Sequence, residues 1–317
     1  MSDILINEIG IPQGSILGPL FFIVYINDLV IFDPNICMVQ YADDTSFAVS
    51  NKNRDLLIKC TNELIEEVNM WFELNKLKLN AEKTNIIQFQ LSTARDSIEN
   101  EIVCDASPLE ITNYVNLLGL SIDNKLKFDT HVENLCKKLS MAFFALFCLK
   151  QKVDKKTLKN CYFAYFQSLL AYGIEIWGHL YGYLFDRIFK LQKKAIRIIA
   201  DVPTKTSCRN LFKELCILPL PALYATQVLI FLKKYPDYME GYKLKHPYNT
   251  RQKNQFPPQY HHTALFEKGP SYSAQKLYNK LPEEIRKEGD IQKFKGLAQK
   301  LFLNSDVYSI KDIFDDV

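Results

Sequence analysis

The spacing of apolar residues changes near Thr130, and this change constrains the fold more than any other feature of the sequence. Before Thr130, short apolar runs alternate with helical patterns, as in Ile36–Ala42 followed by Asn53–Lys76. After it, three helical patterns follow one another: His131–Gln151, Lys155–Trp177 and Leu184–Ala200. The sequence therefore predicts an α+β chain, in which a sheet with helices behind it precedes a helical bundle.

Charge divides the 317-residue chain in a similar way. Residues 1–100 carry 7 Lys/Arg against 14 Asp/Glu, residues 101–200 carry 14 against 9, and residues 201–317 carry 18 against 13. With 48% hydrophobic and 24% charged residues, the composition excludes a disordered or low-complexity protein, and the length fits two domains. The acidic front and basic rear indicate acid or metal chemistry in the first part and polyanion binding in the second.

Neither the N-terminal residues nor the cysteines indicate a membrane or zinc protein. Residues 1–8 lack the cationic flank and apolar core of a signal peptide, and Leu20–Phe32 is too short and too interrupted to span a bilayer. The eight cysteines form no Cys-x-x-Cys pair, which structural zinc sites require. We expect an intracellular, soluble protein with reduced cysteines and no zinc; the pattern does not distinguish nucleus from cytoplasm.

Two adjacent carboxylates, Asp43 and Asp44, stand between the predicted strands Ile36–Ala42 and Ser46–Val49. Neighbouring carboxylates repel each other, and a divalent cation held by hard oxygen ligands, Mg²⁺ or Mn²⁺, relieves that repulsion. Alternation along the strand puts Tyr41 on the face of Asp43, where it either contacts a ligand or packs in the core. Taken alone, an acid pair of this kind is more often a solvated hairpin turn.

The segment before this hairpin predicts a tight loop at Gly10–Ser15 and a helix over Ile16–Val30. Ser15 is expected to cap the helix, and Pro19 is tolerated because it lies in the first turn. Since the helix is apolar almost all round, we expect it to be buried.

Taken together, these segments resemble the reverse transcriptase domain of non-LTR retrotransposons. The run Gly10–Phe22 with Tyr25–Leu29 is similar to motif B of that family, and Tyr41–Asp44 falls where motif C belongs. Further motifs follow in the family's order. Motif D is matched by Leu77–Asn80 with Glu82–Thr84, and motif E by Tyr114 with Leu117–Asp123. The rear half resembles the family's thumb and C-terminal segment at Asn249–Arg251 and Leu277–Pro282.

The resemblance implies a partial right-hand polymerase palm, with an antiparallel sheet and helices behind it, over residues 1–128. A helical, thumb-like bundle is then expected over 129–202, and a C-terminal helical region over 203–317 with an irregular connector at 236–272. The fingers and motif A, which precede motif B in the family, are expected to be absent from these residues.

The resemblance also assigns catalytic roles. It implies that Asp43 binds the metal ions, that Asp44 supports the metals and the primer end, and that Lys83 stands near the departing pyrophosphate as an acid or electrostatic stabiliser. Without the resemblance, Lys83 reads equally well as an exposed turn lysine. The implied cofactor is Mg²⁺, or Mn²⁺, in two-metal nucleotidyl transfer.

Nucleic-acid contacts are implied at three further places. Template and incoming nucleotide are expected at Pro12, Gln13, Gly14, Ser15 and Tyr41, although the loop among them could also be an ordinary helix entry. The primer grip is expected at Leu118 and Gly119. Backbone phosphates are expected at Lys193, Lys194 and Arg197, although such lysines could equally form the solvated face of a bundle.

The implied partners are an RNA template, a DNA primer and deoxynucleoside triphosphates, and no membrane. Motif A supplies a further shared carboxylate in the family, and Asp123 and Asp129 do not replace it because they follow motif D. We therefore expect an RNA-directed DNA polymerase fragment with little or no activity on its own, since two cations lacking a shared ligand repel each other. The alternative is a non-catalytic module that binds nucleic acid through its basic helices.

Overall fold

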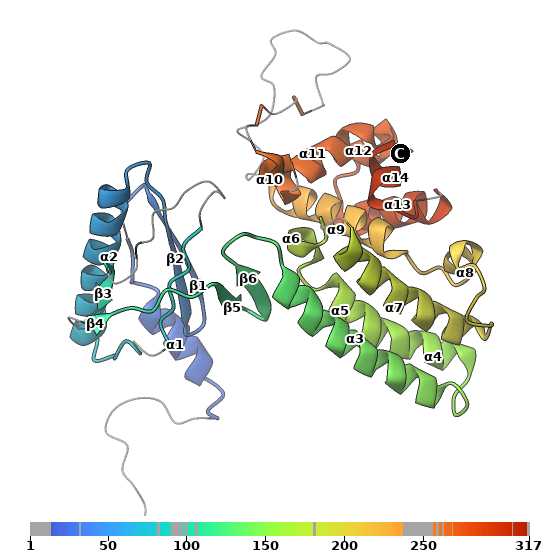
Figure 1. The fold of residues 1–317 in the computed structure, drawn as a ribbon, viewed down its shortest axis with the longest axis horizontal. Coiled ribbons are helices and arrows are strands. Elements are labelled where there is room, and N and C mark those ends of the chain that lie inside the picture. Colours follow the sequence, from blue (N-terminus) through green and yellow to red (C-terminus); the bar gives the residue numbers. More distant parts are fainter. Residues whose placement is uncertain are drawn as a thin grey trace, which may run out of the picture. The chain divides into compact units, whose positions relative to one another are not determined.

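The computed structural model describes residues 14–31, 33–80, 83–89, 98, 101–104, 107–179, 182–236, 256–257, 260–261, 263–267, 269–305 and 307–315. The chain divides into two compact units, residues 1–115 and 116–317. The first is mixed α/β and the second is almost entirely helical (Figure 1). The α+β class is thus confirmed, with small antiparallel sheets and a helical majority.

The first unit is built around a two-stranded hairpin and one long helix. Its elements are α1 (Gly18–Ile26), β1 (Ile36–Tyr41), β2 (Asp44–Val49), α2 (Arg54–Leu74), β3 (Val103–Cys104) and β4 (Ser107–Pro108). β1 pairs with β2 and β3 with β4, both antiparallel. Ile86 forms an isolated parallel bridge with Ile111.

Helix α2 forms as its sequence predicts. Asn53 caps it, because the Asn53 side chain accepts hydrogen bonds from the backbone N–H groups of Asp55 and Leu56. Leu64 and Val68 on one face are buried, and the helix packs against β2 and β3 (Figure 1). The apolar face of α2 is therefore covered within the unit.

Helix α1 does not meet its predicted environment. It begins at Gly18, and the Ser15 hydroxyl caps nothing. Its apolar side chains are exposed by between 45% and 66% at Leu20, Phe21, Ile23, Val24 and Tyr25. Within the helix only Ile26 is buried. The prediction that this helix is buried is wrong for these residues, because no described element covers its outer surface.

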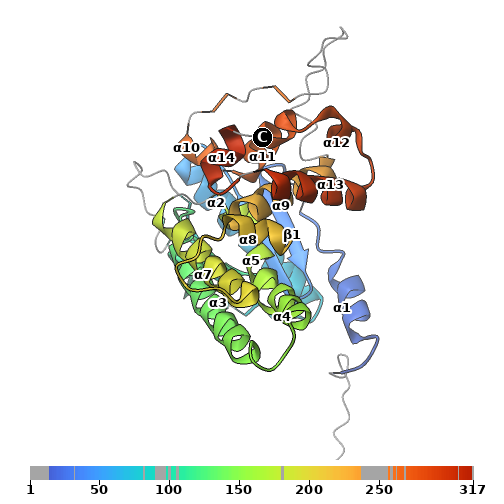
Figure 2. The same cartoon turned by 90° about the vertical axis from the view of Figure 1, so that its right-hand side faces the viewer.

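The second unit opens with a hairpin and continues into helices. The hairpin pairs β5 (Tyr114–Leu117), within which the division of the chain falls, with β6 (Leu120–Asp123). The helices that follow are α3 (Asp129–Leu149), α4 (Lys155–Cys161), the π-helix η1 (Tyr162–Gln167), α5 (Ser168–Ala171), α6 (Ile174–Trp177) and α7 (Tyr183–Ala200). Figure 2 shows α3 and α7 side by side, in agreement with their close packing.

Two apolar segments of this unit are broken by turns. The apolar run Leu117–Ile122 is interrupted at Leu118–Gly119, which joins β5 to β6. The helix expected over Lys155–Trp177 passes through η1 and stops at Tyr172, because Gly173 takes a φ of 59°. Both interruptions contain a glycine in the left-handed region, which glycine enters without steric cost.

Helix α9 (Leu220–Lys234) is the centre of the C-terminal part. It packs against α5, α6, α11 (Pro270–Lys280), α13 (Ile291–Asn304) and α14 (Ile310–Asp315), and Figure 2 shows these last three gathered over it. Shorter helices complete the unit: α8 (Arg209–Glu214), α10 (Ala264–Glu267) and α12 (Glu283–Lys287). One continuous hydrophobic core extends through the helices of the second unit, with Tyr162, Phe166, Trp177 and Phe294 fully buried.

A buried glutamine joins three segments of that core. The Gln192 amide donates to the hydroxyl of Tyr162 and to the carbonyl of Leu218, both at 3.0 Å, and accepts from the N–H of Leu220 at 2.8 Å. Gln192 is fully buried, so every one of these bonds replaces water.

Along the described chain, no helix is long and apolar enough to cross a bilayer.

Candidate functional site

The acid pair lies at the tip of the β1–β2 hairpin. Tyr41 pairs with Asp44, so the turn consists of Ala42 and Asp43 alone. Residues directly opposite each other in an antiparallel pair point to the same face, which places Tyr41 with Asp44. The predicted alignment of Tyr41 with Asp43 is therefore wrong, because the turn interrupts the alternation. Tyr41 is 65% exposed, which resolves the choice between surface and core.

Ala42 takes a φ of 54°, in the left-handed region that a residue with a Cβ rarely adopts. A two-residue hairpin loop requires positive φ at its first central position, and glycine usually supplies it. The hairpin therefore holds Asp43 and Asp44 at its tip in a turn of high local strain.

The two carboxylates fit part of a metal shell. Both Asp43 and Asp44 are exposed, and Mg²⁺ is typically held by one or two carboxylates while waters and substrate phosphates supply the remaining oxygens. Within the described ranges, no three His, Cys, Asp or Glu side chains form a cluster that could hold a metal by themselves. The hairpin can thus contribute two hard oxygen ligands to a cation that has further partners.

Of the predicted nucleotide-binding loop, Pro12 and Gln13 lie outside the described residues. Gly14 takes a φ of 87°, and a Cβ placed there would meet no atom of the described residues within 4 Å. The backbone conformation therefore favours glycine at this position, and no described atom fills the space beside it. Among the residues that the structure describes, the buried Ser15 hydroxyl has no hydrogen-bond partner.

Lys83 lies in a tight turn closed by Asn80. The Lys83 backbone N–H donates to the Asn80 carbonyl at 3.1 Å and to its side-chain oxygen at 3.2 Å. The Lys83 side chain is exposed. The Lys83 ammonium is therefore exposed to solvent. Both a role near a departing pyrophosphate and a simple exposed turn lysine require this.

Leu118 and Gly119 form the loop between β5 and β6. Their φ values are 47° and 83°, so both central residues are left-handed, as in a type I′ hairpin turn. Leu118 is 40% exposed. The predicted primer grip is therefore the tip of a tight hairpin and not the middle of a strand.

The three predicted phosphate-binding cations on α7 have different surroundings. The Lys193 ammonium lies 4.3 Å from the ring centre of Phe189 and 5.5 Å from that of Tyr308, and burial lowers its pKa below the ordinary value. The Arg197 side chain donates to the carbonyl of Thr206 at 2.8 Å. Lys194 is exposed. Two of the three thus have contacts within the unit, and Lys194 faces solvent.

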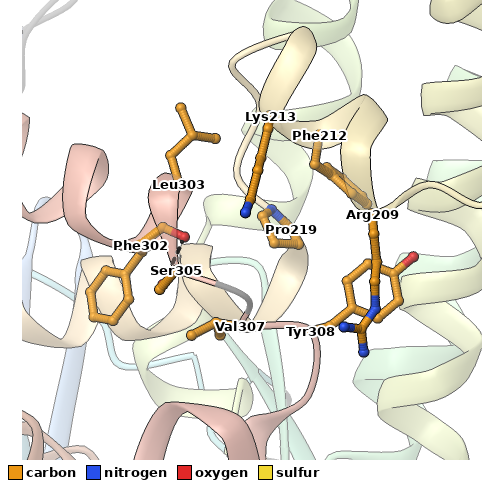
Figure 3. A pocket seen from close by; sticks show the side chains of 9 residues that line it. All are labelled: Arg209, Phe212, Lys213, Pro219, Phe302, Leu303, Ser305, Val307 and Tyr308. Carbon is orange, nitrogen blue, oxygen red and sulfur yellow. Dashed lines mark hydrogen bonds between the residues drawn. The ribbon is translucent and has the colours of Figure 1, made fainter. Parts of the chain in front are cut away.

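A small cavity lies beside Tyr308 (Figure 3). The Arg209 guanidinium covers the Tyr308 ring at 5.0 Å, and Phe212 lies beside it from α8. The cavity measures about 20 Å³, which is room for one water molecule. It is therefore too small for a nucleotide, and its residues fasten the C-terminal segment to α8.

Two further residues of interest, Tyr172 and Gly173, are not among the predicted site residues. The Tyr172 hydroxyl donates to the Leu118 carbonyl, 54 residues away along the chain. The signal that could have found them is a glycine inside an otherwise continuous helical pattern, which marks a break or a close approach.

Comparison with known proteins agrees with the motifs. Residues 5–122 match the family described as "Reverse transcriptase (RNA-dependent DNA polymerase)". That segment contains α1, the β1–β2 hairpin, the Lys83 turn and the Leu118–Gly119 turn.

Curated relatives extend the similarity into the helical unit. The probable RNA-directed DNA polymerase from transposon BS of Drosophila melanogaster is 27% identical over 216 residues, which is 65% of this chain and 24% of that protein. The RNA-directed DNA polymerase from mobile element jockey of the same species is 26% identical over 219 residues, 65% of this chain and 23% of that protein. The chain spans about a quarter of the length of these relatives. No solved structure matches the chain.

Proposed function

We propose that this chain is the motif B to motif E part of a non-LTR retrotransposon reverse transcriptase, with a thumb and a C-terminal region. In this proposal residues 1–128 are palm, 129–202 are thumb, and 203–317 are the C-terminal helical region. The observation that carries the proposal is the strained hairpin tip that presents Asp43 and Asp44 inside the segment matching the reverse transcriptase family.

The roles follow the geometry of the first unit. Asp43 and Asp44 would hold Mg²⁺, which when bound supplies charge neutralisation during nucleotidyl transfer. Tyr41 stands opposite Asp44 on the same exposed face, where a ring can pack against a nucleotide. The open space beside Gly14 allows close approach of a nucleic-acid backbone, and the exposed Lys83 can stabilise a departing pyrophosphate.

The second unit would bind the template–primer duplex. Residues 116–317 carry 32 Lys/Arg against 19 Asp/Glu, a net charge of +13. A surplus of this size attracts phosphate backbones, with an affinity that falls steeply with salt. The same surplus favours a second candidate function, a non-catalytic module that binds nucleic acid.

The 317-residue polypeptide by itself is proposed to have little or no polymerase activity. Two carboxylates can hold one hard cation, but a pair of cations needs a further shared ligand to offset their mutual repulsion. In the family that ligand comes from motif A, which this proposal assigns to none of these residues.

Primer extension tests this proposal. The purified chain is incubated with Mg²⁺, deoxynucleoside triphosphates, and a DNA primer annealed to an RNA template. We expect binding of the primer–template, measured by filter retention across a salt series, without extension. Robust synthesis that Asp43→Asn abolishes would contradict the predicted inactivity. A flat salt response, or no binding, would contradict the nucleic-acid role of the helical unit.

A further inference from the structure

The Leu118–Gly119 turn is hydrogen-bonded to the segment between α5 and α6. The Tyr172 hydroxyl donates to the carbonyl of Leu118 (Figure 1 shows the β5–β6 hairpin and α5). Leu118 is 40% exposed and Tyr172 is 53% exposed, so this hydrogen bond lies at the surface. A surface hydrogen bond adds little to folding free energy, because water can replace it. Its geometric effect on the turn is therefore the more informative property.

The backbone carbonyl of Tyr172 is also hydrogen-bonded. The indole N–H of Trp177 donates to the Tyr172 carbonyl at 2.9 Å, and Trp177 is fully buried in the core. The hydrogen bonds thus run from the core tryptophan through Tyr172 to the carbonyl of Leu118. An exposed turn is thus linked to a fully buried core residue.

The neighbouring glycine brings the two segments together. Gly173 takes a φ of 59°, and a Cβ placed there would lie 2.9 Å from both methyl carbons of Leu120. Leu120, the first residue of β6, is 8% exposed, so its side chain is packed against this glycine. A side chain at 173 would have to displace the Leu120 methyl groups, so the glycine lets the break between α5 and α6 lie directly against the hairpin.

On the outside, the turn and the tyrosine form one small surface. A Cβ placed on Gly119 would lie 3.7 Å from Cε1 of Tyr172, in ordinary contact. The tyrosine ring therefore lies alongside a residue that has no side chain. A bare backbone next to an exposed aromatic ring suits a sugar–phosphate strand, since the glycine allows close approach and the ring supplies a face for packing.

We propose that Tyr172 is a positioning residue that fixes the Leu118–Gly119 turn for the primer strand near its 3′ end. This inference rests on the proposed function, because it takes the turn to be the primer grip. The primer terminus would contact the Gly119 backbone and the exposed edge of the Tyr172 ring.

The test uses the full chain with Tyr172→Phe, which keeps the ring and removes the hydroxyl. Tyr183→Phe, at an exposed tyrosine in the first turn of α7, is the matched control. The first measurement is hydrogen exchange of the peptide covering residues 117–121 in the free protein. We expect faster exchange in Tyr172→Phe than in wild type and control, because the turn loses its anchor.

The second measurement compares two labelled probes by fluorescence anisotropy: an RNA template with a recessed DNA primer, and a blunt RNA–DNA duplex of the same length. Wild type and control should prefer the recessed probe. In Tyr172→Phe, affinity for that probe should fall by about three- to tenfold, the range expected for one lost hydrogen bond, with the blunt duplex unchanged.

Each other outcome overturns the inference in a recognisable way. Unchanged hydrogen exchange would show that Tyr172 does not position the turn. Faster exchange with an unchanged preference for the recessed probe would leave Tyr172 a purely structural role. Wild-type protein that binds nucleic acid without any such preference would remove the primer from this site. Wild-type protein that binds neither probe would contradict the proposed function itself, while the exchange result would still report on the anchor.

Discussion

The two units of this chain bury their apolar residues to very different degrees. Residues 116–317 enclose one continuous core, in which helix α9 is buried along most of its length. Residues 1–115 contain a small buried cluster around Ile98, Ile102, Cys104 and Leu109, and their most apolar helix, α1, is largely exposed. Contiguous exposed apolar surface in a folded protein marks a place where something else binds.

Charge follows the same division. Residues 1–115 carry 7 Lys/Arg against 17 Asp/Glu, a net charge of −10, in contrast to the net +13 of residues 116–317. Only two of the 17 acids stand at the hairpin tip; Glu63, Glu66, Glu67 and Glu73 lie on α2. The basic unit thus buries most of its apolar side chains in one core, whereas the acidic unit leaves the side chains of α1 largely exposed.

The largest expected effect comes from separating the units. Residues 116–317 expressed alone should unfold in a single cooperative thermal transition, with a stability in the range of about 5–15 kcal/mol usual for globular domains. Residues 1–115 alone should show no cooperative transition and should bind a dye specific for exposed apolar surface. Circular dichroism melts and dye fluorescence measure both. A sharp transition in the 1–115 fragment would break the comparison.

Replacing one phenylalanine in each unit tests the same difference in burial. Phe166 is fully buried in η1, so Phe166→Ala should lower the free energy of unfolding of the second unit by about 3–5 kcal/mol. Phe21 in α1 is 52% exposed, and Phe21→Ala should cost less than about 1 kcal/mol. Urea denaturation of the full chain gives both values. Equal losses would mean that α1 is as well packed in solution as the helical core.

Two glycines of the second unit should respond with opposite signs. A Cβ at Gly178 would overlap the Ile174 carbonyl and lie 2.5 Å from Cδ2 of Tyr224, so Gly178→Ala should destabilise by about 2 kcal/mol or more. Gly296 lies within α13 with open space around it, so Gly296→Ala should stabilise by about 0.5–1 kcal/mol. Thermal melts of the two variants decide the matter, and a neutral Gly178→Ala would contradict the close packing of α6 on α9.

The smallest effect concerns pH and His131. Burial, with a contribution from nearby Lys138, lowers the pKa of His131, so the folded unit favours the neutral imidazole. The unfolded chain then binds more protons, and stability should be complete above about pH 6.5 and decline as the pH falls below it. His131→Gln should remove that part of the decline. Stability profiles between pH 5 and 8 check this, and an unchanged slope in the variant would exclude His131 as its source.

Some elements of the fold could be predicted from the sequence because their signals are local. Helix α2 has an asparagine cap and an apolar face, and the β1–β2 hairpin has alternation on both sides of an acidic turn. Helices α3 and α7 likewise follow their apolar period within about two residues. In these segments propensity, pattern and packing agree.

Other features depended on contacts that no local pattern contains. The Leu118–Gly119 turn was hidden inside an apolar run, and its type I′ geometry appears only when β5 and β6 are paired. The break at Gly173 serves the docking of Leu120, which is distant in sequence. The exposure of α1 could not be predicted, because an apolar helix is assigned to the core by composition alone.

Localised radical cleavage gives the most direct test of the central claim, that the Asp43–Asp44 hairpin holds a divalent cation beside the primer end. Fe²⁺ replaces Mg²⁺ in the full chain bound to a primer–template with an end-labelled DNA primer, and ascorbate with peroxide generates radicals at the metal. The account predicts cuts confined to the few nucleotides next to the primer 3′ end, lost in Asp43→Asn and in Asp44→Asn and retained in the control Asp55→Asn. Cleavage spread evenly along the primer, or equally strong in the Asp43 and Asp44 variants, would contradict it.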